Sequence, residues 1–462
     1  MTQTKHRFIG DRKFYSMVLA IALPIMIQNG FTNFVSLLDN IMVGRIGTEE
    51  MSGVSIANQL IFVFNIVIFG VVSGGGIYGA QYFGKHDDEG IKITIRFKLL
   101  LGYLGTLICT VVFLLWGKQL ISLFLTGTDD GGDIAATLEF GKMYVNTMLF
   151  GLPAYTLSQV YASTLRESGE TILPMKAGLY AIATNLVFNW FLIYGKCGFP
   201  ELGVVGAAIA TVLSRYVEAF IIVFICHKSK EKYPFFQGLY RKLIIPKKEF
   251  KSIITAAFPL IMNETMWSLG MTFLVQCYST RGLNAVAGYN ISSVLLNIFN
   301  VSFLAVGNAI GIIIGQLLGA GKVEEAVDTD RKLITFSVFV GTTAGVFMAL
   351  VSPFFPLLYN TTDAVRNVAT ALILAEAVCL PVFAFKNATY FTLRSGGRVW
   401  ITIVFDSAFL WCVGIPTGFI VSRYTSLSVT WIYLIVQAMD IIKCVMGVIL
   451  VKKRIWVRNL VA

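Results

Sequence analysis

The sequence predicts an all-α, polytopic membrane protein in which one module is used twice. Hydrophobic residues make up 56% of the 462 positions and charged residues only 14%, which leaves too little polar surface for a soluble protein of this size. Apolar stretches of roughly 20 residues or more recur along the chain, and each is long enough to cross a bilayer as a helix. The first half of the sequence also recurs, without a gap, 235 positions later.

Matched glycines, prolines and apolar residues identify this repeat. Between residues 20–84 and 255–319, 13 of 65 aligned pairs are identical, and in the first copy these are Ala22, Pro24, Gly47, Gly53, Ile56, Leu60, Phe64, Asn65, Val71, Gly76, Ile77, Gln81 and Gly84. A second block repeats at an offset of 228, where Leu152, Pro153, Thr164, Leu165, Arg166 and Gly169 meet Leu380, Pro381, Thr392, Leu393, Arg394 and Gly397. Repeats of this length form two lobes, and transporters bind substrate where such lobes face each other.

Twelve spans are expected, six in each copy. The apolar runs are continuous instead of alternating, and lipid offers no partner to open strand edges, so the spans are helices. The first run follows a basic segment and has no small-residue cleavage site, so it is a retained span. In chain order the spans cover residues 15–40, 54–82, 96–116, 140–163, 172–194, 202–226, 252–279, 286–317, 333–358, 365–392, 399–421 and 428–451.

The basic residues predict the orientation and the lobes. With both termini on one side, 27 Lys and Arg residues lie on that side and 7 on the other, so the positive-inside rule places both termini in the cytoplasm of a plasma-membrane protein. The strongly basic stretch 227–251 falls where the repeat restarts. We therefore expect an N-terminal lobe over residues 1–226, a cytoplasmic linker over 227–251 and a C-terminal lobe over 252–462. Two parallel bundles with a central cleft would result.

Several chemistries find no support in the sequence. The glycines 74, 76 and 79 match G-x-G-x-x-G, but they lie inside a span and follow no strand, so they indicate helix packing. The three histidines are scattered, no Walker motif is present, and six of the seven cysteines lie in apolar runs. We expect no enzyme, no cofactor, no metal site and no disulfide. The net charge of +11 is explained by an anionic inner leaflet without nucleic acid.

Ionisable residues in the spans are functional candidates because each is costly in lipid. Asp39 lies about 7 Å before the outer turn at Gly44, where it can bind and release a proton, or snorkel to the surface, or cap the helix. Its equivalent in the second copy is Leu274, so the shared fold does not require the acid. Glu264 lies about 18 Å along its span, and its equivalent in the first copy is Asn29. It either binds a cation together with the amide oxygens of Asn263, Asn297 and Asn300 or forms hydrogen bonds that hold helices together.

The other span charges are expected to be structural. Arg215 with Glu218 and Asp440 with Lys443 are pairs at i, i+3. Lys386 and Asp406 fall in the cytoplasmic halves of adjacent spans, and we expect an ion pair between them. Glu376 has no obvious partner. Aromatic, methionine and amide side chains would line a cleft suited to bulky amphipathic ligands: Met26, Phe31, Phe34, Phe64, Asn65, Gln81, Trp267, Asn297 and Asn300.

Three motifs resemble those of the multidrug and toxin extrusion (MATE) family. The stretch Leu38–Gly47, which begins fourteen residues after Pro24, resembles the signature of the family's first span. Thr392–Gly397 resembles the turn after its tenth span, and Gly203–Thr211 resembles the opening of its sixth. The resemblance covers nearly the whole chain.

This resemblance implies cation-coupled efflux, in which H⁺ or Na⁺ moves inward as an organic, often cationic, compound moves outward through a V-shaped cleft. Asp39 matches the first-lobe acid that many members protonate, and Asn185 and Asn189 match the polar pair of the fifth span. Some members carry an aspartate where this chain has Asn189. A sodium-coupled branch has acids in its seventh and tenth spans; Glu264 lies about three residues from the first, and Phe383 stands at the second.

Two other functions were weighed against this one. A lipid-linked saccharide flippase of the same superfamily would need a cationic cleft for pyrophosphate, and a lipid-modifying membrane enzyme would need a convergent nucleophile and base or metal. Neither set is visible in the spans. The expected partners are drug-like small molecules and membrane lipids, and we expect a monomer.

Overall fold

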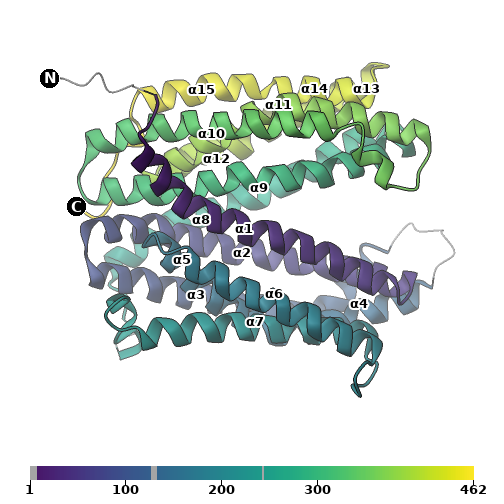
Figure 1. Cartoon of the computed structure of the whole chain (residues 1–462), viewed down its shortest axis with the longest axis horizontal. Helices are drawn as coiled ribbons and strands as arrows, with labels where there is room; N and C mark the ends of the chain where they lie inside the picture. Colours follow the sequence, from purple (N-terminus) through teal and green to yellow (C-terminus); the bar gives the residue numbers. More distant parts are fainter. Residues whose placement is uncertain (1–7, 126–132, 242–243) are drawn as a thin grey trace. The chain divides into compact units, whose positions relative to one another are not determined.

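The computed structural model describes residues 8–125, 133–241 and 244–462. Within these residues every regular element is helical, and the all-α prediction is confirmed (Figure 1). The helices form twelve consecutive segments that match the twelve predicted spans in order. They are α1 (Arg12–Gly44), α2 (Thr48–Lys85), α3 (Asp88–Ser122), α4 with α5 (Ile134–Met148 and Leu152–Glu167), α6 (Ile172–Tyr194), α7 (Gly203–Lys228), α8 (Lys247–Ser279), α9 (Leu283–Gly319), α10 (Val323–Val351), α11 (Asp363–Ser395), α12 with α13 (Val399–Ile403 and Ile415–Tyr424) and α14 with α15 (Val429–Ala438 and Asp440–Lys452).

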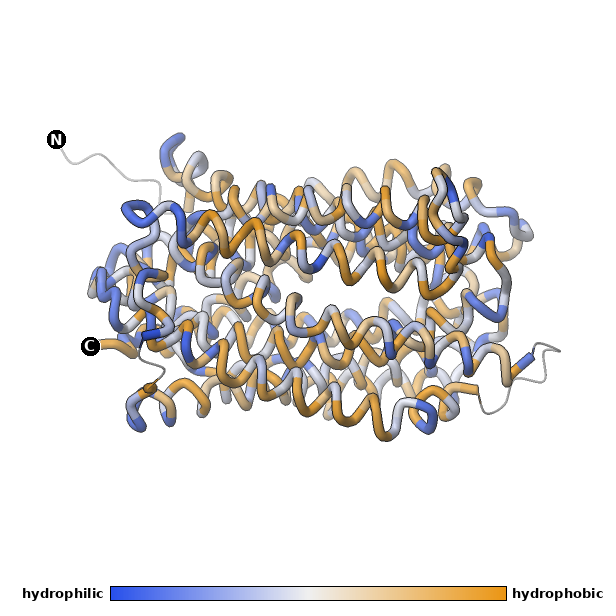
Figure 2. Tube along the Cα trace, turned by 90° about the horizontal axis from the view of Figure 1, so that it is seen from below, coloured by the Kyte–Doolittle hydropathy of each residue, from blue (hydrophilic) through white to orange (hydrophobic). Residues whose placement is uncertain are grey.

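Ten of the described segments are long and apolar enough to cross a membrane. The other two are α8 and the segment of α4 and α5, which a short 3₁₀ turn at Leu149–Gly151 interrupts. Figure 2 shows hydrophobic residues along the helices and hydrophilic residues gathered toward their ends. The chain is therefore a multi-pass membrane protein.

Local signals set several helix ends. Asp87 caps α3 by accepting from the Gly90 backbone N–H at 2.9 Å, and Asp133 caps α4 by accepting from Ala135 and Ala136. Such caps satisfy N–H groups that have no partner within the helix. Gly195 ends α6 with φ +61°, a left-handed conformation that glycine adopts without steric cost.

The chain forms two compact units. The C-terminal unit contains residues 1–26, 80–86 and 262–462, and the N-terminal unit contains residues 27–79 and 87–261. These boundaries differ from the predicted lobes, because α1, α2 and α8 each contribute to both units. The dividing points in α1 and α8 follow Met26 and Ile261, which are 235 positions apart and thus equivalent in the repeat.

A segment after α15 anchors several helix ends of the C-terminal unit. Trp456 is fully buried, and the Leu460 N–H donates to Gln81 Oε1 at 2.7 Å. Gln81 Nε2 donates to the carbonyls of Ser395 and Arg458 at 3.1 and 3.2 Å. The end of α2 is thereby tied to the turn between α11 and α12.

Repeat-related glycines lie at a close crossing of α2 and α9 in the same unit. A Cβ at Gly84 would collide with the carbonyl group of Gln316, and a Cβ at Gly319 would collide with that of Gln81. Both pairs are related by the 235-residue offset, so the contact is reciprocal. Close backbone approach explains why both copies keep glycine at this place.

The N-terminal unit has its own apolar core, and the predicted linker folds onto it. Phe64 is fully buried in that core and lies 5.9 Å from the Tyr155 ring. In the linker, Phe236 stacks on Tyr161 with ring centroids 4.5 Å apart. Arg96 of α3 donates from Nε to the Leu239 carbonyl at 3.1 Å.

Candidate functional site

Asp39 of α1 is held by two amides of α6 in the N-terminal unit. Asn189 donates from Nδ2 to Asp39 Oδ1 at 2.6 Å. The orientation of the Asn185 amide that satisfies both of its ends points Nδ2 at the two Asp39 oxygens, at 3.0 and 3.3 Å, and lets its oxygen accept from Thr211 of α7 at 3.2 Å. The structure thus brings together the three residues predicted for this site.

The Asp39 carboxylate is half-buried and, within the described residues, forms no ion pair within 4.0 Å. Amide donors stabilise a carboxylate but add no charge, so the site can change its charge by taking up a proton or a cation. Asn189 and Asn185 lie four residues apart on α6, which places both side chains on one face of that helix.

The equivalent position in the C-terminal unit has no polar group. Leu274 is buried in an apolar cluster with Tyr278, Leu372 and Tyr433. A Cβ on Gly418 would lie 3.0 Å from Leu274 Cδ2, so this region is densely packed. The two copies therefore differ in chemistry at one equivalent point, as the sequence predicts.

Glu264 belongs to a separate network in the C-terminal unit. Tyr390 of α11 donates to Glu264 Oε1 at 3.0 Å. The neighbouring Asn263 donates to Asp406 Oδ2 at 3.2 Å, and Ser407 donates to the Asn263 side-chain oxygen at 2.7 Å. Glu264 thus contacts a phenol and does not contact the predicted amides Asn297 and Asn300 in any described hydrogen bond.

The backbone around Asp406 departs from α-helical geometry. Two π-helical stretches, Val404–Ala408 and Leu410–Gly414, separate α12 from α13. Single π-turns are rare and occur frequently at functional sites, because they re-aim side chains within a helix. Here the first stretch contains both Asp406 and Ser407, the two residues that hold Asn263.

The lysines of the C-terminal unit have other partners than predicted. Lys386 pairs with Asp440 at 2.5 Å, and Lys443 pairs with Asp406 at 3.2 Å. The expected ion pair of Lys386 with Asp406 is wrong. The packing of the helices places the carboxylate of Asp440, on α15, against the Lys386 ammonium group instead. Lys443 also lies 3.9 Å from Asp440, so the i, i+3 pair is present at the limit of contact.

Arg215 and Glu218 form no ion pair within 4.0 Å among the described residues, although both lie on α7. The Arg215 guanidinium lies over the Tyr155 ring, 4.9 Å from its centroid. A cation over an aromatic face is stabilised by the ring quadrupole, so the Tyr155 ring helps to hold the charge of Arg215. The prediction of a simple pair is thus corrected.

Two further acids are buried in the C-terminal unit. No partner for Glu376 is apparent from the sequence, and Asp330 is not identified there. Glu376 accepts from the Ser292 hydroxyl at 3.0 Å, and Asp330 accepts from Thr392 at 2.6 Å. Both side chains are fully buried. Hydroxyl donors of this kind satisfy one oxygen of each acid without a charge.

The glycine-rich stretch of α2 makes room for an ion pair that the sequence does not reveal. Lys98 of α3 is fully buried and lies 2.6 and 2.7 Å from the oxygens of Glu167 on α5. A Cβ at Gly75 would lie 2.7 Å from Lys98 Cγ, and Cβ atoms at Gly76 and Gly79 would meet the Glu167 carboxylate. The glycines thus serve side-chain packing inside a helix, as the sequence context predicts.

The predicted cleft residues divide into four groups. Phe64 and Gln81 are fully buried, whereas residues that line an open cleft would be partly exposed. Met26 packs against the core of the C-terminal unit. Phe31, Phe34, Trp267 and Asn297 are exposed.

Asn65 and Asn300 form the fourth group and are equivalent in the repeat. In each of them, the side-chain oxygen is buried and has no hydrogen-bond partner among the described residues. The described residues contain no group of three or more His, Cys, Asp or Glu side chains that could hold a metal ion, and their cysteines are free.

The sequence of this chain is similar to a known family and to proteins named as multidrug resistance proteins. The MatE family matches residues 24–191 and 259–420. A probable multidrug resistance protein NorM of Thermotoga maritima is 26% identical over 427 residues, which cover 90% of this chain and 88% of that protein. The multidrug resistance protein NorM of Vibrio cholerae is 25% identical over 434 residues, with coverage of 90% and 88%.

Solved structures have the same fold. A MOP superfamily transporter from Pyrococcus furiosus superposes with a TM-score of 0.85 at 20% identity, over 98% of this chain and 99% of that chain. A structure of MATE in the bent conformation gives a TM-score of 0.86 at 20% identity, over 96% and 95%.

Proposed function

This chain belongs to the MatE family, and on that premise we propose that it is a secondary active antiporter that exports organic, often cationic and amphipathic, compounds in exchange for H⁺ or Na⁺. The names of its relatives, multidrug resistance proteins, support the substrate class. The observation that carries the coupling is Asp39, a carboxylate inside a span that two amides hold and that forms no ion pair with any described lysine or arginine. The transporter resides in the cell membrane with cytoplasmic termini, and it needs no cofactor beyond the transported ion.

Asp39 couples the two fluxes through a change of charge. The ionised acid attracts a cationic compound or a sodium ion, and the protonated acid attracts neither. Protonation also weakens the hydrogen bonds from both amides, because a neutral carboxyl group is a weaker acceptor than a carboxylate, so the contact between α1 and α6 loosens. An ion that binds one conformation more tightly than the other shifts the population between inward-open and outward-open states.

The pairing of the lysines argues against the flippase alternative. Lys98, Lys386 and Lys443 lie in spans, and each pairs with a carboxylate. These ammonium groups are therefore occupied and do not offer a site for pyrophosphate.

The experiment is drug efflux from proteoliposomes that hold the full chain. Ethidium or norfloxacin transport is measured under a proton gradient and a sodium gradient imposed separately. We expect transport under at least one gradient, its loss in Asp39→Asn, and normal transport in Asp363→Asn, a matched control at an exposed acid of α11. Coupled transport by Asp39→Asn would contradict the role of Asp39, and absence of efflux by the parent chain under both gradients would contradict the function.

A further inference from the structure

A pocket of about 310 Å³ lies between α3 and α4 in the N-terminal unit. This volume is at the lower end of the range for small-molecule sites. Its lining includes Phe113, Leu114, Gly117 and Lys118 from α3 and Lys142 and Asn146 from α4. The pocket contains none of the residues proposed above for transport.

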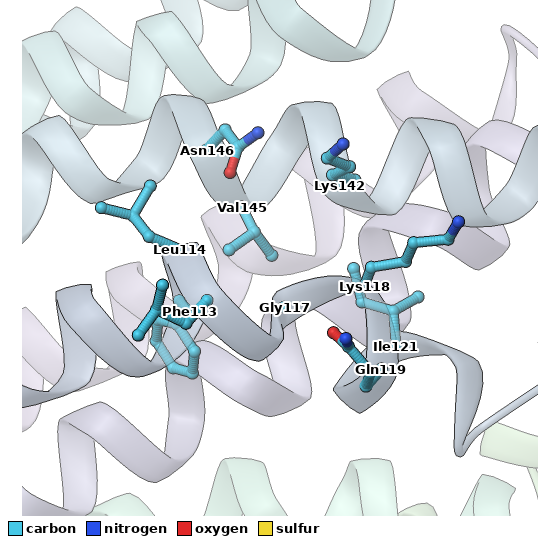
Figure 3. Close-up of a pocket in the computed structure, with 10 residues that line it drawn as sticks. Phe113, Leu114, Gly117, Lys118, Gln119, Ile121, Lys142, Val145 and Asn146 are labelled. Carbon is cyan, nitrogen blue, oxygen red and sulfur yellow. The ribbon is translucent and has the colours of Figure 1, made fainter.

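The pocket is charged at one end and apolar at the other. Figure 3 shows Lys118 and Lys142 together at one end, and Phe113 and Leu114 at the other. Leu114 is 61% exposed, and the neighbouring Leu115 and Trp116 are exposed as well. The apolar end therefore opens onto a surface of α3 that suits acyl chains.

Neither lysine is neutralised by a described residue. Lys118 and Lys142 form no ion pair or hydrogen bond in the described part of the chain, and Glu139, three residues before Lys142, is not within 4.0 Å of it. The side chains of Lys118 and Lys142 are exposed, so both ammonium groups are accessible to an anion.

Gly117 provides open space between the two ends. A Cβ at this position would meet no atom within 4 Å. Lys118 and Lys142 are also two of only seven basic residues predicted on the outer side of the membrane. A positive pocket of this kind stands out on a side that is otherwise poor in cations.

We propose that this pocket binds an anionic phospholipid, with its phosphate between Lys118 and Lys142 and an acyl chain along Phe113 and Leu114. Lysine binds phosphate as a point charge. Asn146, one turn after Lys142 on α4, lies toward the Leu114 end of the pocket (Figure 3). A lipid held there would link α3 to α4 at the predicted outer ends of these helices.

The test measures lipid preference on the full chain in phosphatidylcholine nanodiscs. Association of spin-labelled phosphatidylglycerol is compared with that of spin-labelled phosphatidylcholine. We expect the parent to prefer phosphatidylglycerol, and the double variant Lys118→Gln/Lys142→Gln to lose that preference, by about five-fold for each lysine. Lys196→Gln, a control at another exposed lysine predicted on the outer side, should keep it.

A second variant separates a built pocket from a diffuse surface charge. Gly117→Leu keeps both lysines and fills the open space, so it should weaken phosphatidylglycerol association while phosphatidylcholine association stays unchanged. Unaltered thermal unfolding shows that each variant is folded. The proposal is overturned if the double variant keeps the parent's preference, if Gly117→Leu binds like the parent, or if inorganic phosphate displaces the lipid at equal concentration.

Discussion

In the N-terminal unit Asp39 accepts hydrogen bonds from two amides, whereas in the C-terminal unit Asp406 and Asp440 pair with Lys443 and Lys386. The repeat gives both units the same scaffold, so the difference comes from a few substitutions. A carboxylate that is paired with a lysine is neutralised and holds helices together. A carboxylate that is held by amides keeps its charge available for an ion, which makes Asp39 the better coupling group.

The largest effect is expected when a lysine is removed from a buried ion pair of the C-terminal unit. Lys443→Met leaves Asp406 without its cation in a largely buried place, and we expect a loss of about 3–5 kcal/mol of unfolding free energy. Thermal unfolding in detergent measures the effect. The double variant Lys443→Met/Asp406→Leu removes both charges and should recover most of the stability. A single variant as stable as the parent would show that this pair does not hold the fold.

Removal of an amide should change transport more than folding. Asn189→Leu takes the shorter hydrogen bond from Asp39, at an expected cost of about 1–3 kcal/mol. The lost donor stabilises the ionised acid more than the protonated acid, so its removal favours protonated Asp39. The pH at which transport is half-maximal should therefore rise, as a pH series in proteoliposomes would measure. Asn189→Asp is the companion variant, because it restores polarity but creates a two-acid site. If both variants have the pH profile of the parent, Asn189 has no role in the coupling of transport to the ion.

The sequence predicts the spans well and the partners of their charges poorly. Continuous apolar runs identify the helices, and family motifs bring Asp39, Asn185 and Asn189 together; the family match confirms that resemblance. Helices that are apolar all round do not show which face is buried, so the burial of Phe64 and Gln81 could not be foreseen.

The misassigned ion pair has a related cause. Lys386 and Asp440 are 54 positions apart on different helices, and only their packing brings them together. Spacing along one helix predicts neighbours at i, i+3, which is why Lys443 with Asp440 could be expected. The pair Lys98–Glu167 has no such local signal in the sequence. Only the G-x-G-x-x-G stretch of α2, whose glycines make room for the pair, is visible in the sequence.

Acids that accept hydrogen bonds from hydroxyl groups test whether unpaired and lysine-paired acids contribute differently to stability. Like Asp39, they form no ion pair with a described residue. Glu376 is fully buried and contacts only the Ser292 hydroxyl among the described hydrogen bonds. Glu376→Gln keeps the shape and can retain that contact, so we expect a change in stability below about 1 kcal/mol. Asp440→Asn, the matched change at a lysine-paired acid, should cost more. Equal losses measured by thermal unfolding would remove the distinction between the two classes of acid.

The smallest effect is expected where a paired acid lies in a loop outside the spans. Glu170 pairs with Lys232 at 2.5 Å; partial burial opposes ionisation, but the hydrogen bond and charge of Lys232 prevail and hold the pKa of Glu170 below its ordinary value of 4.5. Stability from this pair is therefore fully present above pH 4.5 and is lost as the pH falls through the lowered pKa. Because Lys232 is mostly exposed, solvent screens the pair and limits it to about 0.2–1 kcal/mol. Unfolding of Glu170→Gln should differ from the parent by this amount at pH 7 and should converge with it in acid. A stability loss as large as that of Lys443→Met would mean that the buried pair of Lys443 with Asp406 is no more important for folding than the exposed pair of Lys232 with Glu170.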